Sequence, residues 1–176
     1  MNNIIIAIGQ SGSGKTTWVK QNFVDAHTIE NLKEGLVKYC KTDSDCLLLG
    51  HYNVGIRTEG TDTLSYNAID EVLEFMFNED KCNYSTVVAE GDRINNAKFF
   101  QRIAQQSMNI HVELHYFKCD LAESMERLKK AGSTITETFV KTTMTKSANN
   151  AKLARQLGFN VTIHDTNSKQ RGLWGM

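Results

Sequence analysis

Short apolar runs alternate with segments of helical periodicity along the chain. Five runs, rich in β-branched residues or alternating in polarity, have the pattern of strands: residues 4–8, 46–49, 85–89, 111–119 and 160–164. Apolar positions three or four apart predict helices between them: residues 15–24, 66–77, 95–107, 121–131 and 148–157. This order predicts one α/β domain over residues 1–176 with a mostly parallel, five-stranded sheet.

Composition narrows the class of protein. Hydrophobic residues make up 40% and charged residues 23% of the 176 positions, which excludes a disordered chain. No apolar run approaches the ~20 residues that a membrane helix needs, so we expect no membrane partner. The first residues lack the basic region of a signal peptide, and no Cys-x-x-Cys pair indicates zinc. We therefore expect a cytoplasmic protein.

A glycine-rich motif carries the clearest chemical signal. Residues 9–16, GQSGSGKT, fit the pattern G-x-x-x-x-G-K-[ST] between a predicted strand and a predicted helix. Glycines let such a loop point successive N–H groups at phosphate oxygens, and the helix start adds its dipole. A lysine then binds the β- and γ-phosphates, and a hydroxyl ligates Mg²⁺. The predicted ATP and Mg²⁺ contacts are Gly9, Ser11, Gly12, Ser13, Gly14, Lys15, Thr16 and Thr17.

A second motif, TVVAEGDR at residues 86–93, ends another predicted buried strand. Ligands of α/β sheets bind at the carboxyl ends of the strands. There, Glu90 can orient Mg²⁺ or its water, Asp92 can accept a proton, and Arg93 can neutralise a phosphoryl group. The alternative is a polar turn with Asp92 near a helix N-cap.

The predicted loop at residues 51–65 offers substrate contacts. Asp62 and Ser65 either cap the following helix or hold the acceptor, and Asp62 rivals Asp92 as general base. Arg57 is a further substrate candidate. Three residues at the start of the loop could stack on or hydrogen-bond to a base: His51, Tyr52 and Asn53.

The net charge of zero hides two charged segments. Residues 59–92 hold nine acidic residues and one basic residue, a balance of −8. Residues 127–155 hold seven basic residues and one acidic residue, a balance of +6. We expect a mobile lid at about residues 132–147, with Arg127, Lys141 and Lys146 as its phosphate- or substrate-binding candidates. A solvated helix face would have a similar charge.

These motifs together resemble the small P-loop kinases of the nucleoside and nucleotide kinase type. More narrowly, Gly9–Thr16, GTDTLS at 60–65 and EGDR at 90–93 resemble bacteriophage kinases that phosphorylate 5-hydroxymethyluracil in DNA. The resemblance implies a P-loop NTPase three-layer sandwich with a helical lid. It also implies Mg²⁺-dependent transfer of the ATP γ-phosphate to the base hydroxymethyl group, in the host cytoplasm. The implied catalytic residues are Lys15, Asp62, Asp92 and Arg93, with Thr16 and Glu90 at the metal.

Two other functions fit the same motifs. A kinase for a free nucleoside or nucleotide needs no DNA-binding surface. A nucleotide-dependent switch would hydrolyse slowly and signal through its lid. The paired carboxylates Glu90 and Asp92 favour phosphoryl transfer over switching.

Overall fold

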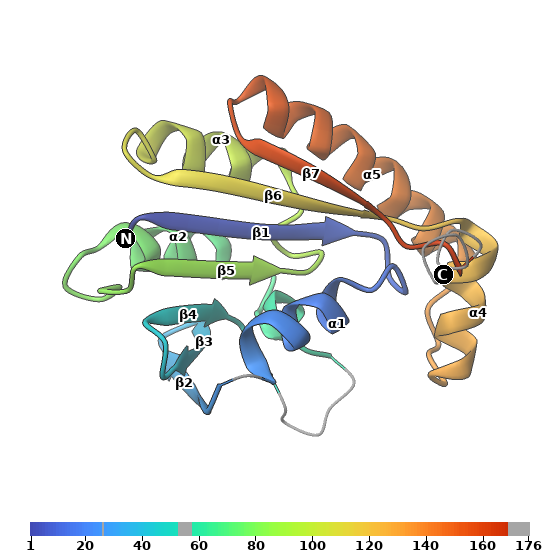
Figure 1. The fold of residues 1–176 in the computed structure, drawn as a ribbon, viewed down its shortest axis with the longest axis horizontal. Coiled ribbons are helices and arrows are strands. Elements are labelled where there is room, and N and C mark those ends of the chain that lie inside the picture. Colours follow the sequence, from blue (N-terminus) through green and yellow to red (C-terminus); the bar gives the residue numbers. More distant parts are fainter. Residues whose placement is uncertain (26, 53–57, 169–176) are drawn as a thin grey trace, which may run out of the picture.

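A seven-stranded sheet forms the centre of the protein. The computed structural model describes residues 1–25, 27–52 and 58–168. The strand order is β2-β3-β4-β5-β1-β6-β7, and the five strands from β4 to β7 in that order run parallel (Figure 1). The strands are β1 (Asn3–Gly9), β2 (Ile29–Glu34), β3 (Val37–Thr42), β4 (Cys46–Leu49), β5 (Thr86–Glu90), β6 (His111–Lys118) and β7 (Asn160–Asp165).

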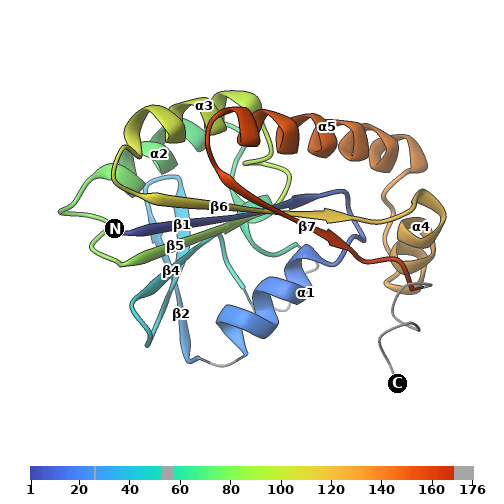
Figure 2. The ribbon, with the colours of Figure 1, turned by 45° about the horizontal axis from the view of Figure 1, so that its top comes forward.

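Helices cover both faces of this sheet. Helices α2, α3 and α5 lie on one face, α1 lies on the other, and α4 stands beyond the carboxyl ends of the parallel strands (Figures 1 and 2). The predicted three-layer α/β class with a mostly parallel sheet is therefore confirmed. The helices are α1 (Lys15–Val19), α2 (Ile69–Phe77), α3 (Ala97–Gln106), α4 (Leu121–Lys130) and α5 (Glu137–Gln156).

The central strand β1 is buried on both faces, which explains its continuous apolar sequence. Ile4, Ile6 and Ile8 pack in the core beneath α2, α3 and α5. Ala7 joins Val88 in a smaller cluster on the α1 side. Burial fixes the register of this strand, so the position of Gly9 at its carboxyl end is fixed as well.

All five predicted strands are present, but the predicted strand count is two short. Strands β2 and β3 form an antiparallel hairpin at the edge of the sheet. Their sequences, IENLKE and VKYCKT, contain few apolar residues, and only two of their side chains, those of Val37 and Cys40, are fully buried. This hairpin therefore lacks the continuous apolar run that predicts β1, β4 and β5.

Two helices differ from their predicted bounds or type. The last helix begins at Glu137, not 148, because its buried stripe consists of small or polar residues rather than large apolar ones. That stripe is Val140, Thr143, Ser147, Asn150, Ala151 and Ala154. Most of the predicted lid at 132–147 is therefore the first half of α5. The helix predicted at 15–24 continues past α1 as a π-helical turn, Lys20–Val24.

The loop predicted at residues 51–65 is partly ordered structure. His51 bridges to Gly60, and Thr61–Thr63 form a 3-10 turn. Arg57 and Asn53 lie outside the described residues. Within residues 1–25, 27–52 and 58–168, no helix is both long and apolar enough to cross a membrane.

Candidate functional site

The glycine-rich loop joins the end of β1 to the start of α1, as predicted. Gly12 has a φ of 79° and Gly14 a φ of 95°, conformations that residues with side chains rarely adopt. A Cβ on Gly12 would lie 2.8 Å from the Ser124 carbonyl oxygen, so α4 closes against the loop there. A Cβ on Gly14 would meet no atom within 4 Å. The loop is thus packed on one side and open on the other.

Lys15 is held inside the loop. Its Nζ donates to the Gln10 carbonyl oxygen at 3.1 Å, and the side chain is mostly buried. Ser13 Oγ is buried without a hydrogen-bond partner among the described residues. A buried hydroxyl without a partner is costly, so a ligand that hydrogen-bonds to Ser13 would remove that cost.

Glu90, at the end of β5, lies directly beside this loop. Thr16 Oγ1 donates to Glu90 Oε1 at 3.0 Å, and the Glu90 side chain is buried. Burial raises the pKa of Glu90 to about 7, Lys15 opposes this, and the charge of Asp62 adds to it. Burial is the largest cause because a desolvated carboxylate loses its hydration. The structure thus brings together Thr16 and Glu90, the two predicted metal ligands.

Asp62 comes to the same strand end from the other direction. Its Oδ1 accepts hydrogen bonds from the backbone N–H groups of Asp92 at 2.8 Å and Arg93 at 3.2 Å. Asp62 therefore fixes the turn after β5. Of the two alternatives for Asp62 and Ser65, capping of the next helix is excluded, because α2 has Ala68 at its N-cap and no side-chain cap bond. The N-cap of α3 is likewise Asn96 rather than Asp92.

Asp92 and Arg93 have different partners. Asp92 Oδ1 forms an ion pair with Lys146 Nζ of α5 at 3.0 Å. The Arg93 guanidinium carbon lies 3.4 Å from the centroid of the Tyr66 ring, and Nε donates to the Leu64 carbonyl oxygen. Tyr66 is 80% exposed. Arg93, the residue after Asp92, thus lies over one face of an exposed aromatic ring in a cation–π contact.

The three predicted lid cations separate in the structure. Arg127 donates to the Gly12 carbonyl oxygen at 3.2 Å and to the Thr166 carbonyl oxygen, and so joins α4 to the loop. Lys146 reaches Asp92. Lys141 instead pairs with Glu137, one turn earlier on the exposed side of α5.

A pocket of about 670 Å³ opens beside the loop. Its walls include the phosphate-loop residues, Arg127, and the segment at the end of β7 and just after it. The structure adds an aromatic wall: His164 stacks on Phe117 with ring centroids 4.5 Å apart, and its Nε2 lies 2.9 Å from His115 Nδ1. Trp18 packs on His115 at 4.4 Å. Burial lowers the pKa of both histidines.

Sequence reasoning missed this wall because its members come from three elements. Residues 111–119 alternate in polarity, with His115 at a polar position, yet His115 is largely buried under Trp18. The signal is the register of β6 with β7, which pairs Phe117 with His164. Tyr52 is also misplaced by the sequence: it is fully buried and cannot stack on a base.

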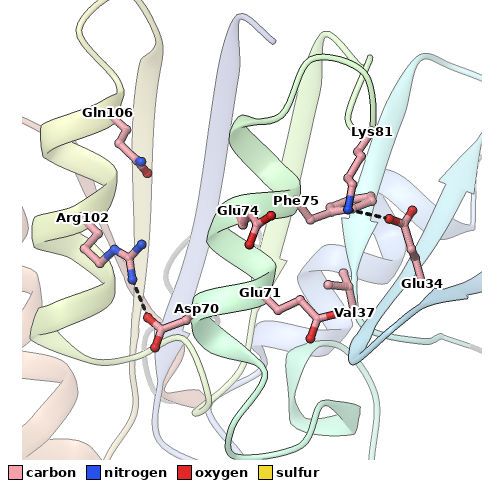
Figure 3. Close-up of a pocket in the computed structure, with 9 residues that line it drawn as sticks. All are labelled: Glu34, Val37, Asp70, Glu71, Glu74, Phe75, Lys81, Arg102 and Gln106. Carbon is pink, nitrogen blue, oxygen red and sulfur yellow. Dashed lines mark hydrogen bonds and ion pairs between the residues drawn. The ribbon is translucent and has the colours of Figure 1, made fainter.

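A second hollow lies on the opposite face of the sheet, between α2, α3 and the β2–β3 hairpin (Figure 3). Its volume is about 580 Å³. Asp70 pairs with Arg102 across the hollow, and Glu34 pairs with Lys81 at 3.0 Å. Glu71 accepts a hydrogen bond from the Leu36 N–H at 2.9 Å and so seats the hairpin turn.

The sequence matches no protein-family model and no curated protein. Among solved structures, the fold is similar to deoxyadenosine kinase from M. mycoides with bound dCTP, at 12% identity and a TM-score of 0.44, covering 96% of this chain and 94% of that chain. The same enzyme with bound dATP gives 13% identity and a TM-score of 0.40, covering 94% and 91%. The likeness is one of overall fold.

Proposed function

We propose that the protein is an ATP-dependent phosphotransferase that moves the γ-phosphate onto a hydroxyl group of a nucleobase-containing acceptor. One observation carries the proposal: a buried carboxylate, Glu90, hydrogen-bonded to the hydroxyl that follows the phosphate-loop lysine. Carboxylates and a cation, Asp62, Asp92 and Arg93, gather at the same strand end. A nucleotide switch needs the phosphate loop, but it would not need these two additional carboxylates and the arginine beside them.

The donor would bind along the phosphate loop. Its phosphates would accept hydrogen bonds from loop N–H groups, Ser13 and Lys15, with Thr17 at the α-phosphate. Thr16 and Glu90 fit a magnesium site, because Mg²⁺ is usually held by one or two protein oxygens together with substrate phosphates. Bound there, Mg²⁺ would supply charge neutralisation on the phosphate oxygens. Arg127 would align the loop through Gly12.

Asp62 is our candidate for the group that accepts the proton of the attacking hydroxyl. Two backbone N–H groups hold its Oδ1, while no hydrogen bond or ion pair within the described residues engages its Oδ2. Asp92 is the weaker candidate, because protonating it would leave Lys146 without its counter-charge. Arg93 would compensate charge on the phosphoryl group, as an arginine does in other phosphotransferases.

Two acceptor classes follow from different observations. A free nucleoside or nucleotide is favoured because Lys141 and Lys146 are both engaged in ion pairs within the protein, which leaves fewer cations for a DNA backbone. The second candidate is 5-hydroxymethyluracil in DNA. It is supported by the sequence resemblance and by exposed Tyr66, because a base taken out of the duplex, at a cost of about a few kcal/mol, stacks on such rings.

Transfer of labelled γ-phosphate from ATP with Mg²⁺ tests the proposal. The acceptors are duplex DNA with 5-hydroxymethyluracil, unmodified DNA, free nucleosides and free nucleotides, and Lys15→Met protein is the matched control. Label on any acceptor that disappears with Lys15→Met supports a kinase, and its location identifies the acceptor class. Nucleotide binding without label on any acceptor would favour a switch.

A further inference from the structure

Aromatic side chains form one wall of the pocket beside the phosphate loop. This single pocket of about 670 Å³ is lined both by phosphate-loop residues and by Trp18, Phe117 and His164. Trp18 comes directly after Thr17 in α1, and the rings of Phe117 and His164 lie almost parallel, with an angle of 7° between them. A nucleotide whose phosphates occupy the loop would therefore find a flat, largely apolar surface for its base in the same pocket.

The ring of His164 is also the end of a chain of polar contacts. Its Nε2 lies 2.9 Å from His115 Nδ1, and His115 Nε2 lies 3.4 Å from Glu113 Oε2. The other ring nitrogen, His164 Nδ1, has no hydrogen-bond partner in the part of the chain that the structure describes. It is not one of the buried side-chain atoms without a partner there, so it is accessible from outside. One nitrogen of this pocket-lining ring is therefore open to a hydrogen bond from a ligand.

The order of these contacts fixes which ring nitrogens carry protons. A carboxylate only accepts hydrogen bonds, so His115 Nε2 carries the proton that faces Glu113. Burial lowers the pKa of both histidines, although Glu113 opposes this at His115, so each ring is neutral near pH 7 and carries one proton. His115 Nδ1 is then an acceptor, and His164 Nε2 must donate to it. His164 Nδ1 is left unprotonated, as a hydrogen-bond acceptor.

We propose that His164 is a specificity-determining residue for the donor nucleotide: its Nδ1 accepts a hydrogen bond from an exocyclic amino group of the base, such as the 6-amino group of adenine. This rests on the proposed function, because it requires a nucleoside triphosphate in the phosphate loop. An unprotonated nitrogen attracts an amino group and repels a carbonyl oxygen. A base with a carbonyl group at the same position is therefore disfavoured.

The test compares two ligands that differ only by this amino group, ATP and purine riboside triphosphate, both with Mg²⁺ and without acceptor. Calorimetric titration should show that the unsubstituted protein binds ATP about 10-fold more tightly, the effect of one hydrogen bond. His164→Phe keeps an aromatic ring but removes the acceptor, so it should bind the two ligands equally well. His27→Phe, at a histidine paired with Asp43 near the edge hairpin, is the matched control and should keep the 10-fold difference.

Nitrogen-15 spectra of the histidine rings test the tautomer without any substitution. We expect His164 to be protonated at Nε2 and unprotonated at Nδ1 in the free protein. Addition of ATP should shift the Nδ1 resonance, because the amino group donates to it. Purine riboside triphosphate should leave this resonance largely unchanged.

Each other outcome overturns a specific statement. If His164 Nδ1 is protonated, or if the unsubstituted protein binds both ligands equally well, the inference is wrong, although the proposed function stands. If His164→Phe keeps the 10-fold difference, another group recognises the amino group and the inference is also wrong. If the unsubstituted protein binds neither triphosphate, the proposed function itself fails.

Discussion

Two hollows of similar volume, about 670 Å³ beside the phosphate loop and 580 Å³ between α2 and α3, differ in how their polar groups are satisfied. In the second hollow, two ion pairs neutralise part of the charge: Asp70 with Arg102 and Glu34 with Lys81 (Figure 3). Beside the first, Ser13 Oγ has no hydrogen-bond partner among the described residues, and burial raises the pKa of Glu90 to about 7. The two hollows therefore differ not in volume but in whether the buried polar groups beside them have hydrogen-bond partners.

The physical reason lies in what each region must do. Exposed ion pairs keep a surface soluble and contribute little to stability, so they can form freely. Buried groups without partners reduce stability, and they persist where a ligand completes their hydrogen bonds. The comparison predicts large functional effects around the phosphate loop and small, purely structural effects in the second hollow.

Lys15→Met should have the largest effect. We expect phosphoryl transfer to fall by about 1,000-fold or more, because a preorganised cation on the transferring phosphate is lost. Steady-state transfer assays measure this, and circular dichroism checks the fold. Retention of more than about a tenth of the activity would remove Lys15 from the proposed mechanism.

Asp62→Asn should come next, with a fall in turnover of about 100-fold, because general-base catalysis is lost. The amide oxygen of Asn can still accept from the N–H groups of Asp92 and Arg93, so the turn should remain intact. Asp92→Asn is the matched comparison and should reduce turnover less. The reverse order would make Asp92 the base, and near-normal transfer by both variants would contradict general-base catalysis by either carboxylate.

Glu90→Gln should change how stability depends on pH. The native pKa of Glu90, about 7, lies above its ordinary value of 4.5. Between these values the native state binds more protons than the unfolded state, so the free energy of unfolding falls as pH rises, by up to about 3 kcal/mol. Urea unfolding at pH 5 and pH 8, without ligand, measures this decline. It should shrink in Glu90→Gln, and an unchanged decline would mean that Glu90 is not its source.

Arg102→Met should have the smallest effect. Its partner, Asp70, is 64% exposed, so breaking this ion pair should lower the free energy of unfolding by less than about 1 kcal/mol. Phosphoryl transfer should be unchanged. A loss of activity here would show that the second hollow takes part in function, and the comparison between the two regions would fail.

Much of the fold and part of the site are predictable from sequence. Strands β1, β4 and β5 were predicted because burial on both faces demands continuous apolar runs, and β6 was predicted from its alternation in polarity. The β2–β3 hairpin was not, since exposed edge strands carry no such pattern. The start of α5 was also missed, because its buried stripe contains Thr143, Ser147 and Asn150. Their burial depends on partners such as Asn95, which bonds to both Ser147 and Asn150.

The sequence by itself determined the phosphate loop and the Glu90–Arg93 strand end, because both are short local motifs at the ends of buried strands. Tertiary structure alone decided which groups meet there. Asp62 lies 30 residues before Asp92 and Lys146 lies 54 after it, yet both contact it. The buried Tyr52 hydroxyl, which has no partner among the described residues, likewise exists only in the packed chain, since solvation in the unfolded state would satisfy it. Local motifs depend only on residues that are neighbours in the sequence. These contacts, and buried groups without hydrogen-bond partners, arise only when distant segments pack together and exclude water.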